Sequence, residues 1–159
     1  MYDDLRSIQE ARDKVARAHS AALELACLDQ VAVDRCVKAM GEAAESAAHE
    51  LARSAVDETG MGRYEDKVTK NLFSAVEVLR YILPMRTCGV LSENTETRVK
   101  ELAIPMGVVA ALLPTTNPTS TAIYKALIAL KSRNAVVFSP HPRATGCVQE
   151  TVEILAGAP

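Results

Sequence analysis

Two short segments near the end of the chain carry the residues best suited to chemistry. They are Leu113-Pro-Thr-Thr-Asn117 and Ser139-Pro-His-Pro142. Asn117 offers a neutral N–H donor on a tight turn, where it could stabilise a developing oxyanion, an effect commonly worth ~3 kcal/mol. The alternative is that this amide bonds to its own backbone and only shapes the turn. His141 offers a hydrogen-bonding imidazole, or else it stiffens a surface loop between two prolines.

Two strands and a connecting helix are predicted to position these segments. Val108–Leu113 is apolar without alternation, which is typical of a parallel strand covered on both faces. Thr119 or Ser120 is expected to cap a helix that runs to Arg133, and Asn134 begins the second strand. Neighbouring parallel strands end at the same edge of a sheet, and ligands of α/β sheets bind there. We therefore expect a ligand crevice between the two segments.

The first half of the chain shows helical periodicity rather than strands. The first predicted helix covers about Leu5–Leu25. A second is capped by Asp29 and bends or ends near Gly41–Ser46, and its continuation stops at Gly60. A further helix begins at about Tyr64 and is ended by Pro84. The remaining predictions are a loop over Arg86–Asn94, a strand over Thr97–Ile104 and a last helix from near Ala144 to Gly157. The charged residues Glu42, Glu45, Glu50, Arg53, Asp57 and Glu58 are interpreted as a solvated helical face.

Composition excludes several classes of partner. A net charge of −2, no Trp and two Phe give no electrostatic or stacking reason to expect nucleic acid. The longest nearly apolar run is far shorter than a membrane span, and three dispersed histidines predict no metal site. Four scattered cysteines without a C-x-x-C pair favour reduced thiols, and the charged start is unlike a signal peptide. We therefore expect a cytoplasmic protein. The cysteines are Cys27, Cys36, Cys88 and Cys147. Cys27 and Cys36 fall on predicted helices and are expected to be buried.

Several strings of residues resemble the CoA-acylating aldehyde dehydrogenases. They are Pro114–Ile123, Leu130–Ala135, Phe138–Ala144 and, upstream, Glu58–Gly62, Glu65–Lys67, Lys70–Asn71 and Thr87–Glu93. The resemblance implies oxidation of a small aldehyde by NAD and coenzyme A, through an active-site cysteine that forms a thiohemiacetal and then a thioester. It also implies a homo-oligomer, since the family uses a β-flap in assembly.

The fold implied is α/β: N-terminal helices followed by the first part of a Rossmann-like parallel sheet. Residues 1–84 would be the helical region and residues 85–159 the first βαβ part of the NAD(P)-binding domain, with the catalytic domain absent. No cysteine of this chain matches the family nucleophile, so we expect the chain alone to be inactive.

The resemblance also assigns roles to the two segments. Asn117 matches the family's oxyanion-hole amide, and Leu113, Pro114, Thr115 and Thr116 match the wall along the nicotinamide. Ser139, Pro140, His141 and Pro142 match the loop against the adenosine ribose. No acidic residue follows that strand closely and Arg143 could meet a phosphate, which leaves NAD versus NADP open.

Two other functions compete with this one. A hydrolytic aldehyde dehydrogenase disagrees with Thr115–Thr116, where an aromatic residue is usual, and with Ser-Pro-His-Pro in place of Lys-Pro. A stand-alone nucleotide-binding or assembly module derived from such an enzyme would bind a nucleotide or a polypeptide without turnover.

Overall fold

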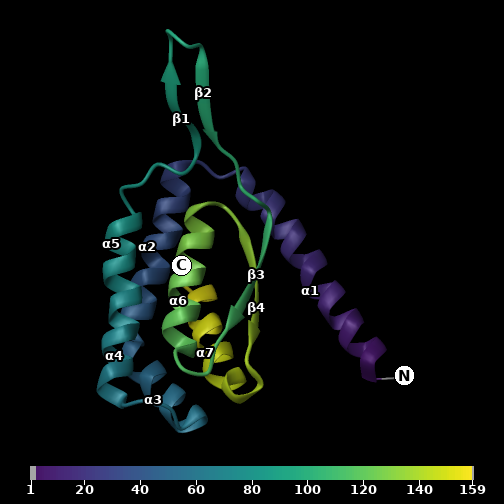
Figure 1. Cartoon of the computed structure of the whole chain (residues 1–159), viewed down its shortest axis with the longest axis vertical. Coiled ribbons are helices and arrows are strands. Elements are labelled where there is room, and N and C mark those ends of the chain that lie inside the picture. Colours follow the sequence, from purple (N-terminus) through teal and green to yellow (C-terminus); the bar gives the residue numbers. More distant parts are fainter. Residues whose placement is uncertain (1–2, 159) are drawn as a thin grey trace.

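The computed structural model describes residues 3–158 and contains a helical half followed by a mixed half (Figure 1). The helical half consists of α1 (Asp3–Ala26), α2 (Gln30–Ser46), α3 (Ala48–Thr59) and α4 (Tyr64–Leu72), which continues through a π-helical segment (Phe73–Glu77) into α5 (Val78–Ile82). The mixed half consists of β1 (Gly89–Asn94), β2 (Val99–Ala103), β3 (Val108–Leu113), α6 (Pro118–Lys131), β4 (Ala135–Pro140), a 3-10 turn (Pro142–Ala144) and α7 (Thr145–Ala156).

The predicted parallel pair is confirmed. Strands β3 and β4 pair in parallel from Val108 opposite Ala135 to Leu113 opposite Pro140, with α6 as their connection. The Asn134 side chain fixes the start of the pair, because its Oδ1 accepts from the N–H groups of Met106 (2.6 Å) and Gly107 (2.9 Å). The α/β fold class predicted from the sequence is therefore correct.

The N-cap of helix α6 lies two or three residues earlier than predicted, so neither Thr119 nor Ser120 caps it. Asn117 is the N-cap residue, without a side-chain capping bond, and Pro118 occupies the first helical position, where the missing N–H costs nothing. The Thr119 hydroxyl instead donates to Oδ1 of Asn71 on α4, at 2.8 Å. The capping prediction was wrong because the helix starts at Pro118, which places Thr119 and Ser120 inside its first turn.

The other helix boundaries follow local signals. The Asp29 carboxylate accepts from the N–H of Ala32 at 2.8 Å, as expected of an N-cap. The chain breaks at Ala47 between α2 and α3, and Gly60 ends α3 with a φ of 65° that suits glycine. The helix from Tyr64 runs to Ile82 as one continuous rod with a π-helical middle.

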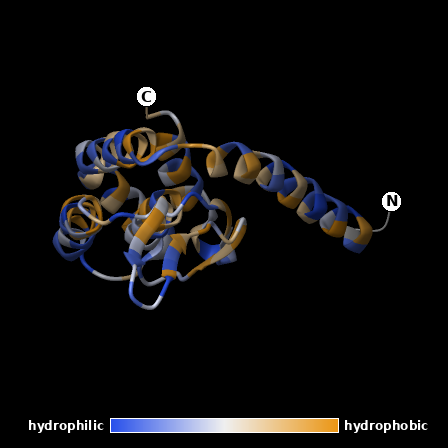
Figure 2. Ribbon diagram, turned by 90° about the horizontal axis from the view of Figure 1, so that it is seen from above, coloured by the Kyte–Doolittle hydropathy of each residue, from blue (hydrophilic) through white to orange (hydrophobic). Residues whose placement is uncertain are grey.

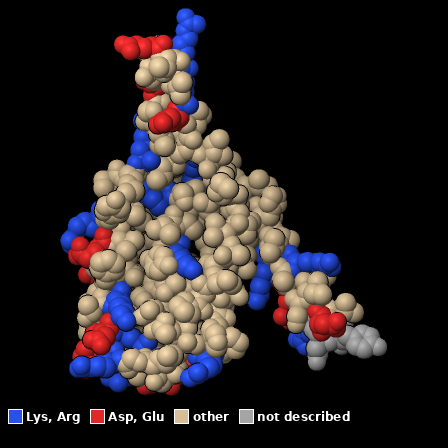
Figure 3. All heavy atoms as spheres, viewed as in Figure 1, with Lys and Arg blue, Asp and Glu red and all other residues tan. Residues whose placement is uncertain are grey.

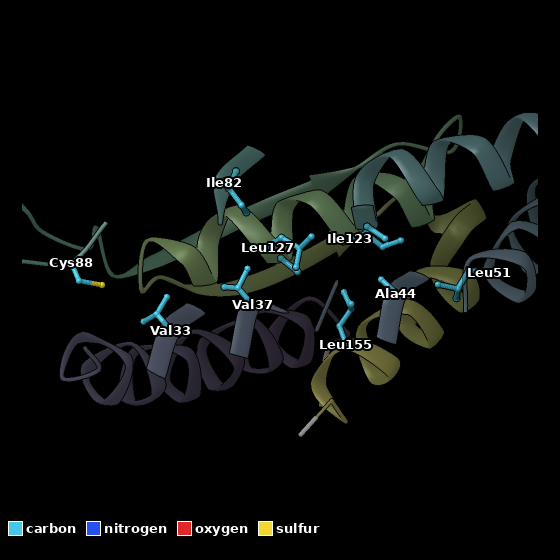
Figure 4. Close-up of a cluster of buried hydrophobic side chains, with 11 residues drawn as sticks. Val33, Val37, Ala44, Leu51, Ile82, Cys88, Ile123, Leu127 and Leu155 are labelled. Atoms are coloured by element: carbon cyan, nitrogen blue, oxygen red, sulfur yellow. The ribbon is translucent and has the colours of Figure 1, made fainter. Parts of the chain in front are cut away.

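A hydrophobic core lies between α2 and α6 and extends to α3, α5 and α7 (Figure 4). Each fully buried aliphatic side chain contributes roughly 1.5–3 kcal/mol. The core takes side chains from both halves of the chain, so the two halves are packed as one body. The larger side chains of this core are those of Val33, Val37, Leu51, Ile82, Ile123, Leu127 and Leu155. The division at residue 84 into separate domains stays a prediction.

Strands β1 and β2 form an antiparallel hairpin that projects from the body (Figure 1). The prediction of a loop over Arg86–Asn94 was wrong, since Gly89–Asn94 pairs with Val99–Ala103. The register shifts between Val90 and Ser92, and such an irregularity removes the strict alternation by which a strand is predicted. Charged side chains of both signs stand along the hairpin in Figure 3.

Helix α1 extends away from the rest of the molecule (Figure 2). Its apolar stripe is present but largely uncovered: Leu5, Ile8 and Val15 are exposed, and Ala22 is buried. Its last turn is held by Arg133, whose guanidinium donates to the carbonyl oxygens of Ala26 (2.8 Å) and of Ala103 on β2 (3.0 Å). Arg133 thus ties α1 and the hairpin to the end of α6. Within residues 3–158, no helix combines the length and apolar character needed to span a bilayer.

Candidate functional site

The two segments singled out in the sequence lie side by side. Leu113 and Pro140 are register partners, and the N–H of His141 donates to the Leu113 carbonyl at 3.0 Å. Leu113 is buried, Thr115 and Pro140 are half-buried, and Pro114, Thr116, Ser139, His141 and Pro142 are exposed. All the predicted site residues therefore border one edge of the parallel pair.

Asn117 is held by side chains rather than by its own backbone. Its Oδ1 accepts from Nζ of Lys70 at 3.0 Å, and its Nδ2 lies 3.4 Å from Oγ1 of Thr116. Because a lysine ammonium only donates, the amide oxygen must face Lys70 and the amide N–H groups must point the other way. The side chain makes no capping bond to α6. This geometry favours a donor role over the turn-shaping alternative.

Three residues of helix α4 form hydrogen bonds with the turn that contains Asn117. Nζ of Lys67 donates to the Thr116 carbonyl at 3.1 Å, Lys70 holds Asn117, and Asn71 accepts from Thr119. Asn71 is fully buried and also donates to the Ala48 carbonyl at 3.0 Å, which anchors the contact to α3. In the sequence, Lys67, Lys70 and Asn71 stand out only through the family resemblance. Their spacing of i, i+3 and i+4 places them on one helical face, which was the available signal.

Lys67 is an unusual member of this contact because it is only 4% exposed. Burial lowers the pKa of its ammonium, and the like charge of Lys70 acts in the same direction. Gly62 precedes α4 with a φ of 78°, which favours glycine, and a Cβ there would make only ordinary contact with Cε of Lys67, at 3.6 Å. The turn before Asn117 is thus held by a desolvated cation that bonds to a carbonyl.

The second segment is organised around His141. Nδ1 of His141 accepts from the N–H of Arg143 at 3.2 Å, which caps the short 3-10 turn. In the neutral ring this leaves Nε2 as an N–H donor on an exposed side chain. The guanidinium of Arg143 reaches back to the Thr59 carbonyl at 3.5 Å. The imidazole keeps one hydrogen-bonding position for a ligand.

Glu58 is exposed, as predicted for a solvated helical face, and it also contacts the start of α7. Its carboxylate accepts from the N–H groups of Gly146 (2.9 Å) and Cys147 (2.7 Å) at the start of α7. Partial desolvation acts to raise the pKa of Glu58, but the backbone donors of Cys147 and Gly146 outweigh it, so the pKa lies below its ordinary value. An anion supplied by the protein itself therefore occupies the N-terminus of α7.

The cysteines are all free, and their burial differs from the prediction for Cys27. Cys27 is exposed just beyond the last residue of α1, Cys36 is half-buried, and Cys88 and Cys147 are buried. Burial, with the Glu58 carboxylate beside it, raises the pKa of the Cys147 thiol to about 12. Cys147 is therefore a packed thiol rather than a nucleophile.

An apolar groove of about 1200 Å³ runs between α1, the outer side of β4 and α7. Phe138, Val148 and Val152 line it, and Pro140 is the predicted cofactor residue that reaches it. Across residues 3–158, no three His, Cys, Asp or Glu side chains gather into a possible metal site.

Comparison with known proteins identifies the family. The model described as the aldehyde dehydrogenase family matches residues 5–159. The chain is 43% identical to the bifunctional aldehyde-alcohol dehydrogenase AdhE of Escherichia coli K12, over 96% of this chain and 18% of that protein. The chain thus spans less than a fifth of that relative's length.

Two solved structures share the fold. An acetylating aldehyde dehydrogenase from Geobacillus thermoglucosidasius superposes with a TM-score of 0.94 at 47% identity, covering 99% of this chain and 36% of that one. A propionaldehyde dehydrogenase from Rhodopseudomonas palustris, solved with bound CoA and an acylated cysteine, gives a TM-score of 0.69 at 30% identity over 91% of this chain and 34% of that one.

Proposed function

Because the chain belongs to the aldehyde dehydrogenase family, we propose that it forms the N-terminal helices and the first part of the cofactor domain of a CoA-acylating enzyme. The complete enzyme converts an aldehyde, NAD⁺ and CoA into acyl-CoA, NADH and a proton. Support for acylation comes from the relative solved with CoA and an acylated cysteine. The observation that carries the proposal is the placement of the Asn117 turn beside the His141 turn at adjacent strand ends.

The proposed roles follow the geometry of the two turns. Leu113–Thr116 forms the wall beside the nicotinamide, and Ser139–Pro142 borders the adenosine ribose, toward which Nε2 of His141 donates. The residues fit a dinucleotide laid across the strand ends, because most of them are exposed and the imidazole keeps a free donor. The start of α7 would not hold its pyrophosphate, since Glu58 already accepts from the N–H groups there. The nicotinamide, when bound, accepts the hydride.

The oxyanion role is assigned to Asn117. A thiolate supplied by another part of the complete enzyme attacks the aldehyde carbonyl, and negative charge gathers on its oxygen. A fixed amide N–H aimed at that oxygen stabilises the charge without reorganising at the moment of reaction. The buried Cys147, with its raised pKa, does not supply the thiolate.

The reaction is tested with the complete polypeptide that carries these residues. NADH formation from a small aldehyde is followed with and without CoA, and with NAD and NADP in parallel. We expect turnover that requires CoA, a preference for NAD, and no turnover by residues 1–159 alone. Replacing Asn117 by Ala should lower kcat by about 10²–10³-fold, the usual loss for one oxyanion donor. CoA-independent release of the free acid would instead indicate a hydrolytic enzyme.

We further propose a cytoplasmic homo-oligomer assembled through the hairpin. Ile104, at its base, is 78% exposed, and Val99 and Leu102 on β2 are exposed as well. Exposed apolar side chains on a projecting hairpin favour burial in an interface. Replacing Ile104 by Glu should reduce the mass of the complete protein in light scattering. Replacing Val31 by Glu on α2, equally exposed at 77%, is the control and should leave the mass unchanged.

A further inference from the structure

We propose that Lys70 is a positioning residue that orients and polarises the Asn117 amide for the reaction. The inference rests on the oxyanion role proposed for Asn117. It adds a residue from the helical half of the chain to a site otherwise built from the ends of β3 and β4.

Hydrogen-bond chemistry determines the orientation of the Asn117 amide. Nζ of Lys70 lies 3.0 Å from Oδ1 of Asn117, and an ammonium can only donate. A flipped amide would set its own N–H groups against that cation, so the contact selects one of two otherwise similar orientations. In the selected one, the Asn117 N–H groups point away from α4, with one of them 3.4 Å from the Thr116 hydroxyl.

Polarisation reinforces the orientation. A cation at the carbonyl oxygen draws electron density from the amide nitrogen, which makes its N–H bonds better donors. A charge-assisted bond of this kind is roughly twice as strong as a neutral one. Because Lys70 is exposed, solvent screens its field, and orientation is the larger part of the effect.

Lys70 is not needed to hold the loop itself. Two other contacts already hold the chain around Asn117: the buried Lys67 donates to the Thr116 carbonyl, and Thr119 donates to the buried Asn71. Removal of Lys70 therefore leaves the loop in place and releases only the Asn117 side chain. This separates a positioning role from a structural one.

A double-mutant cycle in the complete polypeptide tests the inference. Lys70→Met, Asn117→Ala and the double variant are compared by kcat, by KM for NAD and by Tm. Lys70→Met should lower kcat by about 10-fold or more, part of the 10²–10³ lost with the donor itself. Its KM for NAD and its Tm should stay unchanged, and Lys70→Arg should restore most of the rate. In the Asn117→Ala background, Lys70→Met should have no further effect.

The control is Lys38→Met on α2, which removes an equal charge from an exposed helical lysine paired only with Glu42. It should leave kcat unchanged. A full effect of Lys70→Met in the Asn117→Ala background, a selective rise in KM for NAD, or an unchanged kcat would each overturn the inference while leaving the proposed reaction intact.

A structural measurement keeps the inference testable apart from activity. Crystal structures of the complete protein and its Lys70→Met variant should show the Asn117 amide ordered in the first and flipped or disordered in the second, with Thr116 and Thr119 unmoved. An identical, ordered amide in both would refute the positioning role even if no substrate were turned over. A wild-type enzyme without CoA-dependent turnover would contradict the proposed function instead.

Discussion

At the scale of single residues, polar side chains connect elements that are distant in sequence through hydrogen bonds. Glu58 joins α3 to the start of α7, Arg133 joins α6 to α1 and the hairpin, and Asn71 joins α4 to α3 and α6. Each bonds to at least one backbone group of another element. A buried or half-buried backbone group without a partner costs about 1–3 kcal/mol, so these contacts decide which elements pack together.

The Glu58 contact predicts a dependence of stability on pH. A carboxylate with a lowered pKa contributes stability that is complete above its unfolded value, 4.5 here, and is lost as the pH falls through the folded value. Glu58→Gln should therefore lower the free energy of unfolding at neutral pH by about 0.5–1 kcal/mol, since the group is exposed and screened. The difference between the two proteins should shrink as the pH falls below 4.5.

Urea unfolding at a series of pH values measures this difference. Glu45→Gln on α2 is the control, because Glu45 is exposed and its change should leave stability unaltered at every pH. A Glu58→Gln difference that grew with acidification would contradict the sign of the argument.

At the scale of elements, α4 and α6 are held together around the site turn. Thr119 is 2% exposed, and its hydroxyl satisfies the buried Asn71. The expected helix cap at Thr119 is absent because the helix starts at Pro118, so Thr119 lies inside the first turn and its hydroxyl donates to Asn71 instead. The helix still starts, because Pro118 is preorganised for its first position.

Thr119→Val tests the strength of this junction. The two side chains have similar shapes, so the change removes the hydrogen bond and leaves Oδ1 of Asn71 buried without that donor. We expect a loss of about 1–3 kcal/mol in the free energy of unfolding. The matched control is Thr69→Val on exposed α4 surface, where the hydroxyl bonds only to its own helix and the change should stay within about 0.5 kcal/mol. If both substitutions changed the free energy of unfolding equally, the Thr119–Asn71 hydrogen bond would contribute nothing to stability.

At the scale of the whole molecule, one guanidinium bonds to both of the outlying parts, α1 and the hairpin. Arg133 adopts a φ of 59°, which costs a side-chain-bearing residue conformational energy. Its two backbone contacts, to Ala26 and Ala103, offset that cost. Both α1 and the hairpin project from the core (Figure 1), and Arg133 contributes one shared contact to their attachment.

Arg133→Ala should loosen both parts at once. We expect faster amide hydrogen exchange near Ala26 and in β2, with the α2–α6 core protected as before, because the lost contacts lie outside that core. Arg98→Ala is the control: this residue has a similar φ of 56° but stands exposed at the hairpin turn, so its change should affect that turn alone. If amide hydrogen exchange became faster uniformly across the core, the role proposed for Arg133 would be wrong.

The sequence alone determined the elements whose signals are local. Apolar runs specified β3 and β4, Asp29 and Gly60 marked helix ends, and the adjacency of two strand ends followed from the rules of parallel sheets. The site residues predicted at that edge do lie there together. The hairpin strand β1 escaped prediction because its register shift breaks the alternation.

Only the tertiary structure decided which side chains meet across long separations. Lys70 and Asn117 are 47 residues apart, and Glu58 and Cys147 are 89 apart. No periodicity along the chain reports such a pair, because it exists only once α3, α4, α6 and α7 have packed. The same packing places the Glu58 carboxylate at the N-terminus of α7 and buries the Cys147 thiol at the start of that helix.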